Sequence, residues 1–406
     1  MNLPVFGPTV LMAGPDSGRE LSSPLGWSSV QVVLMSWRIA KVAGTDPASP
    51  TVYDKSKGFL FSPGKCYFPH LGVRRYSGEA VPVLKTRFTE LVGCSIPIQQ
   101  AGLGGLANPQ LAAAVANAGA QGMVSVGGLP PGLLADILDK LRQQTTGVFG
   151  CNFLIPFVTE DVRECLAVAA SRARVIDFFW CDPDPSFVEI VHREGALACW
   201  QVGSKTEAMA AADAGCDLIV AQGIEAGGHV RSRIGLLALL SDVLEAVDVP
   251  VIAAGGIGTG RAMAAALAAG ASAVRVGTRL VAAEEAGAHL TYVDALIKSG
   301  PEDTVYTDAF STNWPDAPHR VLRSSLEAAR AFPGDIVGEA TSMYTGEKWP
   351  VHRFDSYTAT RLFTGHVEAV PHWAGESVVG VKRVQPAAEI IHELAGEAED
   401  LLKRWC

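Results

Sequence analysis

Short apolar runs alternate with helical stretches in a regular order between residues 95 and 276. Each apolar run has the length and composition of a strand that is buried on both faces. We expect strands at 95–100, 121–126, 148–154, 174–180, 196–202, 216–222, 249–255 and 272–276. We expect helices between them at 108–120, 131–142, 158–170, 204–214 and 259–270. This alternation predicts a parallel sheet whose faces are covered by helices.

Three of these helices begin with residues that favour a helix start. Asn108 precedes Pro109, which is an N-cap followed by a first-turn proline. Ser204 and Thr259 stand at the beginning of the helices that follow the fifth and seventh strands. Local signals therefore support the helix boundaries that periodicity predicts.

Glycine-rich turns follow the last two expected strands, at Gly255-Gly256-Ile257 and at Gly277-Thr278-Arg279. Consecutive turns with free backbone N–H groups make an anion cradle, and (β/α)8 barrels hold phosphate after their seventh and eighth strands. The turn after the first strand, 101–105, lacks the spacing and the acidic residue of a dinucleotide fingerprint. We therefore predict a closed (β/α)8 TIM barrel and exclude a doubly wound sheet.

The segment Asp217–His229, with the sequence DLIVAQGIEAGGH, is the strongest candidate for a site. His229 lies just past a strand end, after the turn at 223–228, and barrels place their catalytic residues at this end of their strands. Gly227 and Gly228 allow the backbone to approach a flat or anionic ligand. Glu225 could orient His229 or hold the loop, and we favour the structural role.

Composition limits the classes of function. The chain has 406 residues, of which 48% are hydrophobic, so it can bury a large core. A net charge of −9 argues against nucleic-acid binding. No apolar run approaches the ~18–20 residues of a membrane span. The eight cysteines show no metal or disulfide spacing, and we interpret Cys181 and Cys199 as core residues. A cytoplasmic protein is expected.

The two ends of the chain differ from its middle. Residues 1–85 are rich in proline, glycine and serine and predict a largely irregular N-terminal extension. The change of composition near Val83 raises the hypothesis that the natural start lies there, which mass spectrometry of the native N-terminus tests. The barrel should span 86–290. Residues 291–406 predict a mainly helical, aromatic-rich C-terminal appendage, ending in an amphipathic helix over 386–405.

Several motifs together resemble those of the nitronate monooxygenases, a family of FMN-dependent TIM barrels. They are SIPIQQAGLGGLANPQLAAAVANAG at 95–119, GCNFLIPF at 150–157, AQGIEAGGH at 221–229, VIAAGGI at 251–257, VRVGTRL at 274–280 and AGESVVGVKRVQPAAEI at 374–390. The resemblance extends from about Lys85 to the C-terminus. It implies that His229 is the catalytic residue and that FMN is the cofactor.

The resemblance also implies which residues contact FMN. The expected contacts are Ala101, Gly102, Leu103, Asn152, Gln201, Gln222, Gly227 and Gly228 for the ring, and Gly255, Gly256, Gly277 and Thr278 for the phosphate. Carboxamides both donate and accept hydrogen bonds, so they suit the edge of an isoalloxazine ring. Arg261 and Arg279 are weaker candidates for cationic support of the phosphate.

The reaction that the resemblance implies is the oxidation of an alkyl nitronate by O2 to a carbonyl compound and nitrite. His229 would either abstract the α-proton of a nitroalkane or hydrogen-bond the nitro oxygens. The implied partners are a small-molecule substrate and O2, with no nucleic acid and no membrane, and a homodimer stays open. Two departures stand out: Gly102-Leu103 replaces a Pro-Met pair common in the family, and Arg231 and Arg233 follow His229.

Three alternatives remain from the sequence alone. Flavin-dependent enoyl-acyl-carrier-protein reductases share the barrel and a very similar EAGGH turn, and NAD(P)H:quinone reductases resemble the family as well. A flavin-binding protein without turnover is the third alternative. The sequence at 374–390 favours the monooxygenases. Fold analogy alone does not fix the reaction.

Overall fold

The computed structural model describes residues 84–158 and 161–404. The expected N-terminal extension over 1–85 lies outside the described residues, except for its last two positions. The account below therefore concerns the barrel and the region that follows it.

Eight parallel strands form a closed barrel. They are β1 (Ile98–Gln100), β2 (Gly122–Val126), β3 (Phe149–Leu154), β4 (Val175–Phe179), β5 (Leu197–Val202), β6 (Leu218–Gln222), β8 (Val251–Ala254) and β9 (Ala273–Val276). Their order is β1-β9-β8-β6-β5-β4-β3-β2. A parallel bridge between Gln99 and Gln121, with the Gln121 amide donating to the Ile98 carbonyl at 2.9 Å, joins β1 to β2. Every strand that the sequence predicts is confirmed, and so is the TIM barrel.

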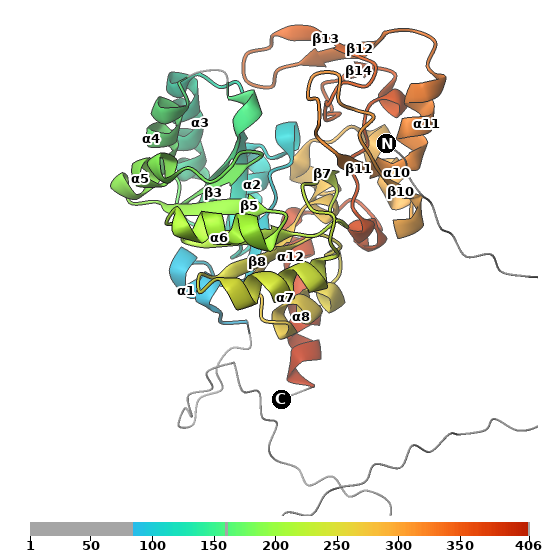
Figure 1. Ribbon diagram of the computed structural model, residues 1–406. Helices are drawn as coiled ribbons and strands as arrows, with labels where there is room; N and C mark the ends of the chain where they lie inside the picture. Colours follow the sequence, from blue (N-terminus) through green and yellow to red (C-terminus); the bar gives the residue numbers. More distant parts are fainter. Residues whose placement is uncertain (1–83, 159–160, 405–406) are drawn as a thin grey trace, which may run out of the picture. The chain divides into compact units, whose positions relative to one another are not determined.

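Helices cover the outside of the barrel (Figure 1). They are α2 (Pro109–Asn117), α3 (Pro131–Gln144), α4 (Val162–Ala170), α5 (Pro185–Arg193), α6 (Lys205–Asp213), α7 (Leu236–Ala246) and α8 (Gly260–Ala268). The side chains of Asn108, Ser204 and Thr259 each accept a backbone N–H of the first turn, so the predicted caps are confirmed. Helix α4 begins later than its predicted start at 158, because Asp161 caps it.

A short helix that the sequence did not predict, α1 (Arg87–Val92), closes one end of the barrel. Phe88 and Val92 are buried in a cluster with the first residues of β4, β5, β6 and β9. These residues mark the amino-terminal end of the strands. The opposite, carboxyl-terminal end is left for the site.

The chain makes a long excursion between β9 and the last helix. It contains α9 (Thr278–Val281), α10 (Leu290–Ile297), α11 (Arg323–Ala331), and the strands β10 (Thr304–Thr307), β11 (His319–Leu322), β12 (Ile336–Thr341), β13 (Lys348–His352) and β14 (Thr364–Gly365). One small antiparallel sheet has the order β10-β11-β7, where β7 is Gly228–His229, and another has the order β13-β12-β14. Short 3-10 helices lie at Gly104–Leu106, Ile155–Phe157, Glu284–Ala286, Pro301–Asp303, Val367–Ala369 and Glu376–Gly380.

The predicted C-terminal amphipathic helix is α12 (Ala387–Lys403), and it packs against α8 and α2. Glu397 accepts a hydrogen bond from the Gly260 amide at the start of α8, at 2.8 Å. Ile390, Ile391 and Leu394 are buried in the main core. Helix α12 thus occupies the place of the eighth helix of the barrel, although more than a hundred residues separate it from β9.

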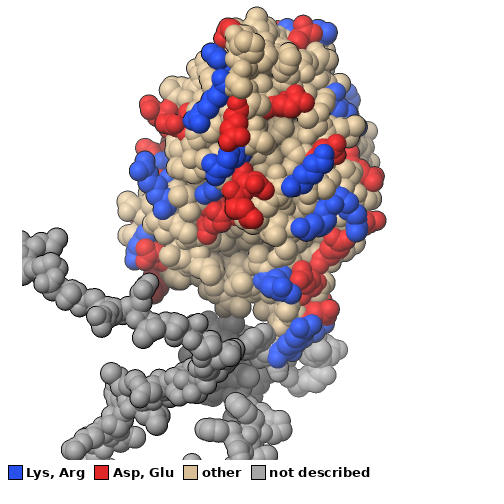
Figure 2. Space-filling model, turned by 90° about the vertical axis from the view of Figure 1, so that its right-hand side faces the viewer, with Lys and Arg blue, Asp and Glu red and all other residues tan. Residues whose placement is uncertain are grey.

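The surface mixes charges of both signs. Figure 2 shows acidic and basic side chains interspersed over one face of the described part of the chain, without a continuous basic stretch on that face. Among the described residues, no helix has the length and apolar character needed to span a membrane.

Candidate functional site

A cavity of about 770 Å³ opens at the carboxyl-terminal end of the barrel strands. Every residue predicted to bind the cofactor lines it, and so does His229. The lining comes from the ends of β1, β3, β5, β6, β8 and β9, and from the excursion between β9 and α12. The barrel therefore brings together the residues that the sequence placed at separate strand ends.

A buried ion pair lies inside the barrel, and its arginine also lines the cavity. The Arg275 guanidinium donates to Asp177 Oδ1 at 2.6 Å, and their side chains are 4% and 0% exposed. Arg275 also donates to Gln99 Oε1 at 2.7 Å and to Gln201 Oε1 at 2.5 Å. Asp177 Oδ2 accepts from Asn152 Nδ2 at 2.6 Å. Five strands (β1, β3, β4, β5 and β9) thus contribute to one polar network, in which the positive charge of Arg275 balances the negative charge of Asp177.

This network fixes which way two of the candidate amides point. A carboxylate only accepts and a guanidinium only donates, so each amide has a single orientation. Asn152 must turn its Nδ2 to Asp177 and keeps Oδ1 as an acceptor. Gln201 must turn its Oε1 to Arg275 and keeps Nε2 as a donor. The sequence predicted that these amides lie at the site, but not which of their atoms, nitrogen or oxygen, faces the cavity.

Gln222 is oriented in the same manner by a backbone group. Its Nε2 donates to the His229 carbonyl at 3.0 Å. Its Oε1 is buried and has no hydrogen-bond partner among the described residues. A buried acceptor without a partner is costly. Gln222 therefore offers an acceptor to whatever N–H group enters the cavity.

The two glycine turns present backbone donors to the cavity. Gly255 and Gly256 have φ values of 113° and 67°, which residues other than glycine rarely adopt. The N–H groups of Gly255, Gly256 and Gly277 donate to no backbone carbonyl of the described residues. The Thr278 hydroxyl accepts from the Gly375 amide at 3.0 Å, which leaves its proton to donate. These groups lie at the two turns where the sequence predicts a phosphate cradle, and phosphate binding there stays a prediction.

Two other glycines allow neighbouring parts of the chain to pack closely against them. A Cβ on Gly227 would lie 2.3 Å from the Gly375 nitrogen, so Gly227 allows the backbone at 374–375 to cross it. A Cβ on Gly102 would lie 2.2 Å from Asn152 Oδ1. Gly102, the departure from the family's Pro-Met pair, thus gives the Asn152 carbonyl its place.

His229 is held by its backbone on both sides. It is in register with His319 across β7 and β11, and the Val230 amide donates to the Pro318 carbonyl at 2.9 Å. The Ser356 Oγ lies 3.4 Å from His229 Nε2. These contacts hold His229 at the cavity wall.

Burial keeps His229 uncharged. Desolvation, and to a smaller extent the neighbouring His319, lower the pKa of His229 well below 6.5. His319 is itself buried, and burial lowers its pKa as well. At neutral pH the His229 ring therefore carries one N–H donor and one free lone pair.

Three tryptophans that the sequence did not assign to the site surround His229. The ring centroids of Trp314, Trp373 and Trp180 lie 3.8, 5.1 and 5.7 Å from that of His229. Trp180 has a φ of 64°, which is a strained conformation for a residue with a side chain. Such residues cluster at functional sites. The many aromatic residues at 314–373 were the sequence signal that could have indicated this wall. No local pattern predicts that the loops carrying them reach His229.

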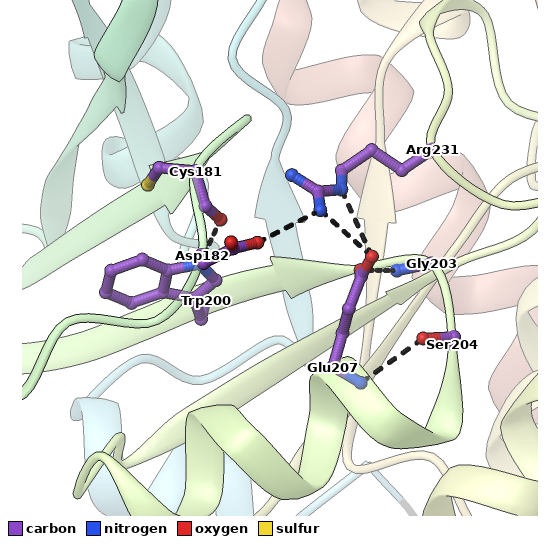
Figure 3. A network of polar contacts seen from close by, with 7 residues as sticks. All are labelled: Cys181, Asp182, Trp200, Gly203, Ser204, Glu207 and Arg231. Carbon is purple, nitrogen blue, oxygen red and sulfur yellow. Dashed lines mark hydrogen bonds and ion pairs between the residues drawn. The ribbon is translucent and has the colours of Figure 1, made fainter.

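Three of the four arginines that the sequence placed near the site contact carboxylates. Arg231 lies 3.0 Å from Glu207 Oε1 and 3.5 Å from Asp182 Oδ1 (Figure 3). Arg233 is exposed. Arg279 pairs with Glu393 at 2.8 Å and Arg261 lies 3.9 Å from Glu397, so both join the barrel to α12. None of the four lines the cavity, and Arg275 is the only arginine or lysine that does among the described residues.

The two cysteines interpreted as core residues, Cys181 and Cys199, form no disulfide and have raised pKa values. Cys199 is fully buried, and burial raises its pKa well above 9.0. Burial raises the pKa of the half-buried Cys181 to about 12. A thiol with so high a pKa is a poor nucleophile.

Glu225 caps the amino-terminal end of helix α7. Both carboxylate oxygens accept from the Leu236 amide, at 2.9 and 3.0 Å, at the first residue of α7. No hydrogen bond joins Glu225 to His229 in the described part of the chain. The structural role favoured from the sequence is confirmed.

Replacing Glu225 with alanine should therefore lower the free energy of unfolding by about 1–2 kcal/mol, because the α7 cap is lost. Glu225→Gln should recover most of that loss, since its amide oxygen still accepts. Urea denaturation of both variants measures the effect. A changed pH profile of turnover in Glu225→Gln would instead show that its charge acts on His229.

Comparisons with known proteins place the chain in a family. The family profile described as nitronate monooxygenase matches residues 85–162 and 155–397. A probable nitronate monooxygenase of Staphylococcus aureus strain Newman is 32% identical over 367 residues, covering 79% of this chain and 99% of the relative. Among solved structures, nitroalkane oxidase from Streptomyces ansochromogenes has a TM-score of 0.63 and 28% identity, covering 79% and 99%. FabK from Thermotoga maritima has a TM-score of 0.64 and 28% identity, covering 79% and 98%.

The profile spans most of the chain, and the motifs that carry the resemblance line one cavity. The chain belongs to the nitronate monooxygenase family of flavin-dependent oxidoreductases.

Proposed function

We propose that this protein binds FMN in the cavity and oxidises alkyl nitronates with O2 to carbonyl compounds and nitrite. Two nitronates and one O2 give two carbonyl compounds and two nitrites, which balances atoms and charge. The observation that carries the proposal is the placement of the unpaired Gln222 Oε1 and the neutral His229 in one cavity. The nitronate monooxygenase relative and the nitroalkane oxidase structure support it.

The donor set fits FMN. An isoalloxazine ring carries an N–H donor and carbonyl acceptors along one edge, so a protein that binds it needs both acceptors and donors there. Asn152 Oδ1 and Gln222 Oε1 are acceptors, and Gln201 Nε2 is a donor, each fixed by its partner. Gly255, Gly256, Gly277 and Thr278 would hold the phosphate through backbone N–H groups and one hydroxyl. When bound, FMN supplies the electron acceptor for the oxidation.

His229 is the proposed catalytic residue. Its lowered pKa leaves a lone pair free at neutral pH, so it can take the α-proton of a nitroalkane and deliver a nitronate in place. The three tryptophan rings would limit the access of water to it, which would strengthen hydrogen bonds from its imidazole to the nitro oxygens. Ser356, 3.4 Å from Nε2, is placed to share in holding those oxygens.

The test is an assay of FMN-loaded protein with ethylnitronate, following O2 uptake and nitrite. We expect nitrite to form at twice the rate of O2 uptake. Protein that holds FMN but forms no nitrite from ethylnitronate would contradict the proposal.

A nicotinamide-dependent reductase is the second candidate. It is favoured by the structural match to FabK, which covers 79% of this chain, the same share as the match to nitroalkane oxidase. It predicts that NADH or NADPH is consumed with an enoyl thioester or a quinone. The same protein preparation can be tested for both activities.

A further inference from the structure

Part of the cavity wall belongs neither to the FMN cradle nor to the surroundings of His229. Leu129 comes from the turn after β2, Leu133 comes from the first turn of α3, and Phe157 follows β3. Met343, Tyr344 and Trp349 come from the β12–β13 hairpin. We call this part of the cavity the apolar arm. In Figure 1 the hairpin lies at the top of the view, apart from the barrel strands. The arm therefore joins two segments far apart in the sequence.

Aromatic contacts connect the apolar arm to His229. Trp314 lies against His229, and its ring centroid is 4.9 Å from that of Phe157. The Phe157 carbonyl accepts from the Gly128 amide at 3.0 Å, which ties Phe157 to the turn that carries Leu129. Ring contacts thus lead from His229 through Trp314 to Phe157 in the arm.

The arm also has a mouth with exposed apolar side chains. Met343 and Trp349 are each 41% exposed, although both line the cavity. Glu347 is the only charged residue that the hairpin contributes to the lining. Exposed apolar groups that border a pocket mark a binding surface more often than packing.

Building on the proposed nitronate oxidation, we propose that the apolar arm binds the alkyl tail of a long, unbranched substrate whose nitronate head lies at His229. A tail running past Trp314 and Phe157 would be buried between the hairpin and the turn after β2. A two-carbon substrate would leave the arm unfilled. The preferred substrate class is therefore a medium- to long-chain primary alkyl nitronate.

Straight-chain nitronates from ethyl to octyl test this inference with the FMN-loaded protein. We expect kcat/KM to rise about two- to four-fold for each added methylene, as burial of a CH2 group predicts. Met343→Ser and Trp349→Ser should each reduce that rise. Met209→Ser is the matched control, because Met209 is 47% exposed and lies outside the cavity lining. It should leave the rise as it is.

A binding measurement separates this inference from the proposed function. Alkanoates share the planar two-oxygen head of a nitronate but cannot be oxidised at it. Their dissociation constants, from tryptophan fluorescence of the FMN-loaded protein, should fall with chain length from propanoate to octanoate. That trend without any nitronate turnover would support the arm and overturn nitronate oxidation. Chain-length independence in both series, or loss of FMN in Met343→Ser, would overturn the arm.

Discussion

His229→Asn should lower kcat/KM for neutral nitroethane by about 10²- to 10⁴-fold, the usual contribution of a general base. The same variant should lose far less on ethylnitronate, which arrives already deprotonated. Asparagine keeps a side-chain hydrogen-bond donor, so it separates proton abstraction from the binding of nitro oxygens. Initial rates on both substrates, with FMN-saturated enzyme, measure the difference.

The control is His366→Asn, because His366 is exposed and lies outside the cavity lining. It should leave both rates as they are. Equal losses on nitroethane and ethylnitronate in His229→Asn would show that His229 binds the substrate without acting as its base.

The pH dependence of nitroethane oxidation follows from the same residue. A histidine whose pKa is lowered stays unprotonated as the pH falls to 6.5. It becomes protonated, and stops acting as a base, only at a lower pH. We therefore expect kcat/KM for nitroethane to show no histidine-like fall between pH 8 and 6.5 from His229. A fall centred near 6.5 that disappears in His229→Asn would contradict the lowered pKa of His229.

Arg275→Met should lower the free energy of unfolding by about 3–5 kcal/mol, because it leaves the buried Asp177 carboxylate without its cation. Gln201 would also lose the donor that orients its amide, so FMN content should fall with stability. Urea denaturation and the flavin content of purified protein measure the two effects.

Arg279→Met is the matched control. Arg279 is also buried, but its partner Glu393 is 46% exposed and can return to water, so the loss should be about 1 kcal/mol. Adding Asp177→Asn to Arg275→Met should recover much of the loss, because no unpaired charge remains. Equal losses in Arg275→Met and Arg279→Met would show that the barrel ion pair carries no special cost.

The barrel could be predicted because its signals are local. Each strand is a short apolar run, and Asn108, Ser204 and Thr259 mark helix starts within the segment that they cap. Helix α1 was missed because six residues are too few to show a helical period. The C-terminal helix was found, but its position between α8 and α2 depends on packing across the whole excursion.

The candidate site could be predicted in part for the same reason. The lining residues follow strand ends, and barrels place ligands there. The polarity of Asn152 and Gln201 depends on Asp177 and Arg275, which lie far from them in the sequence. Likewise, the wall around His229 combines Trp180, Trp314 and Trp373 from three distant segments.

Anaerobic mixing of FMN-loaded protein with ethylnitronate, and separately with NADH and NADPH, tests the central claim most directly. The visible absorbance of the bound flavin reports whether it accepts electrons from each. We expect the absorbance to change rapidly with ethylnitronate and not with either nicotinamide. Rapid loss of absorbance with NADH or NADPH, and none with ethylnitronate, would contradict nitronate oxidation and favour a reductase.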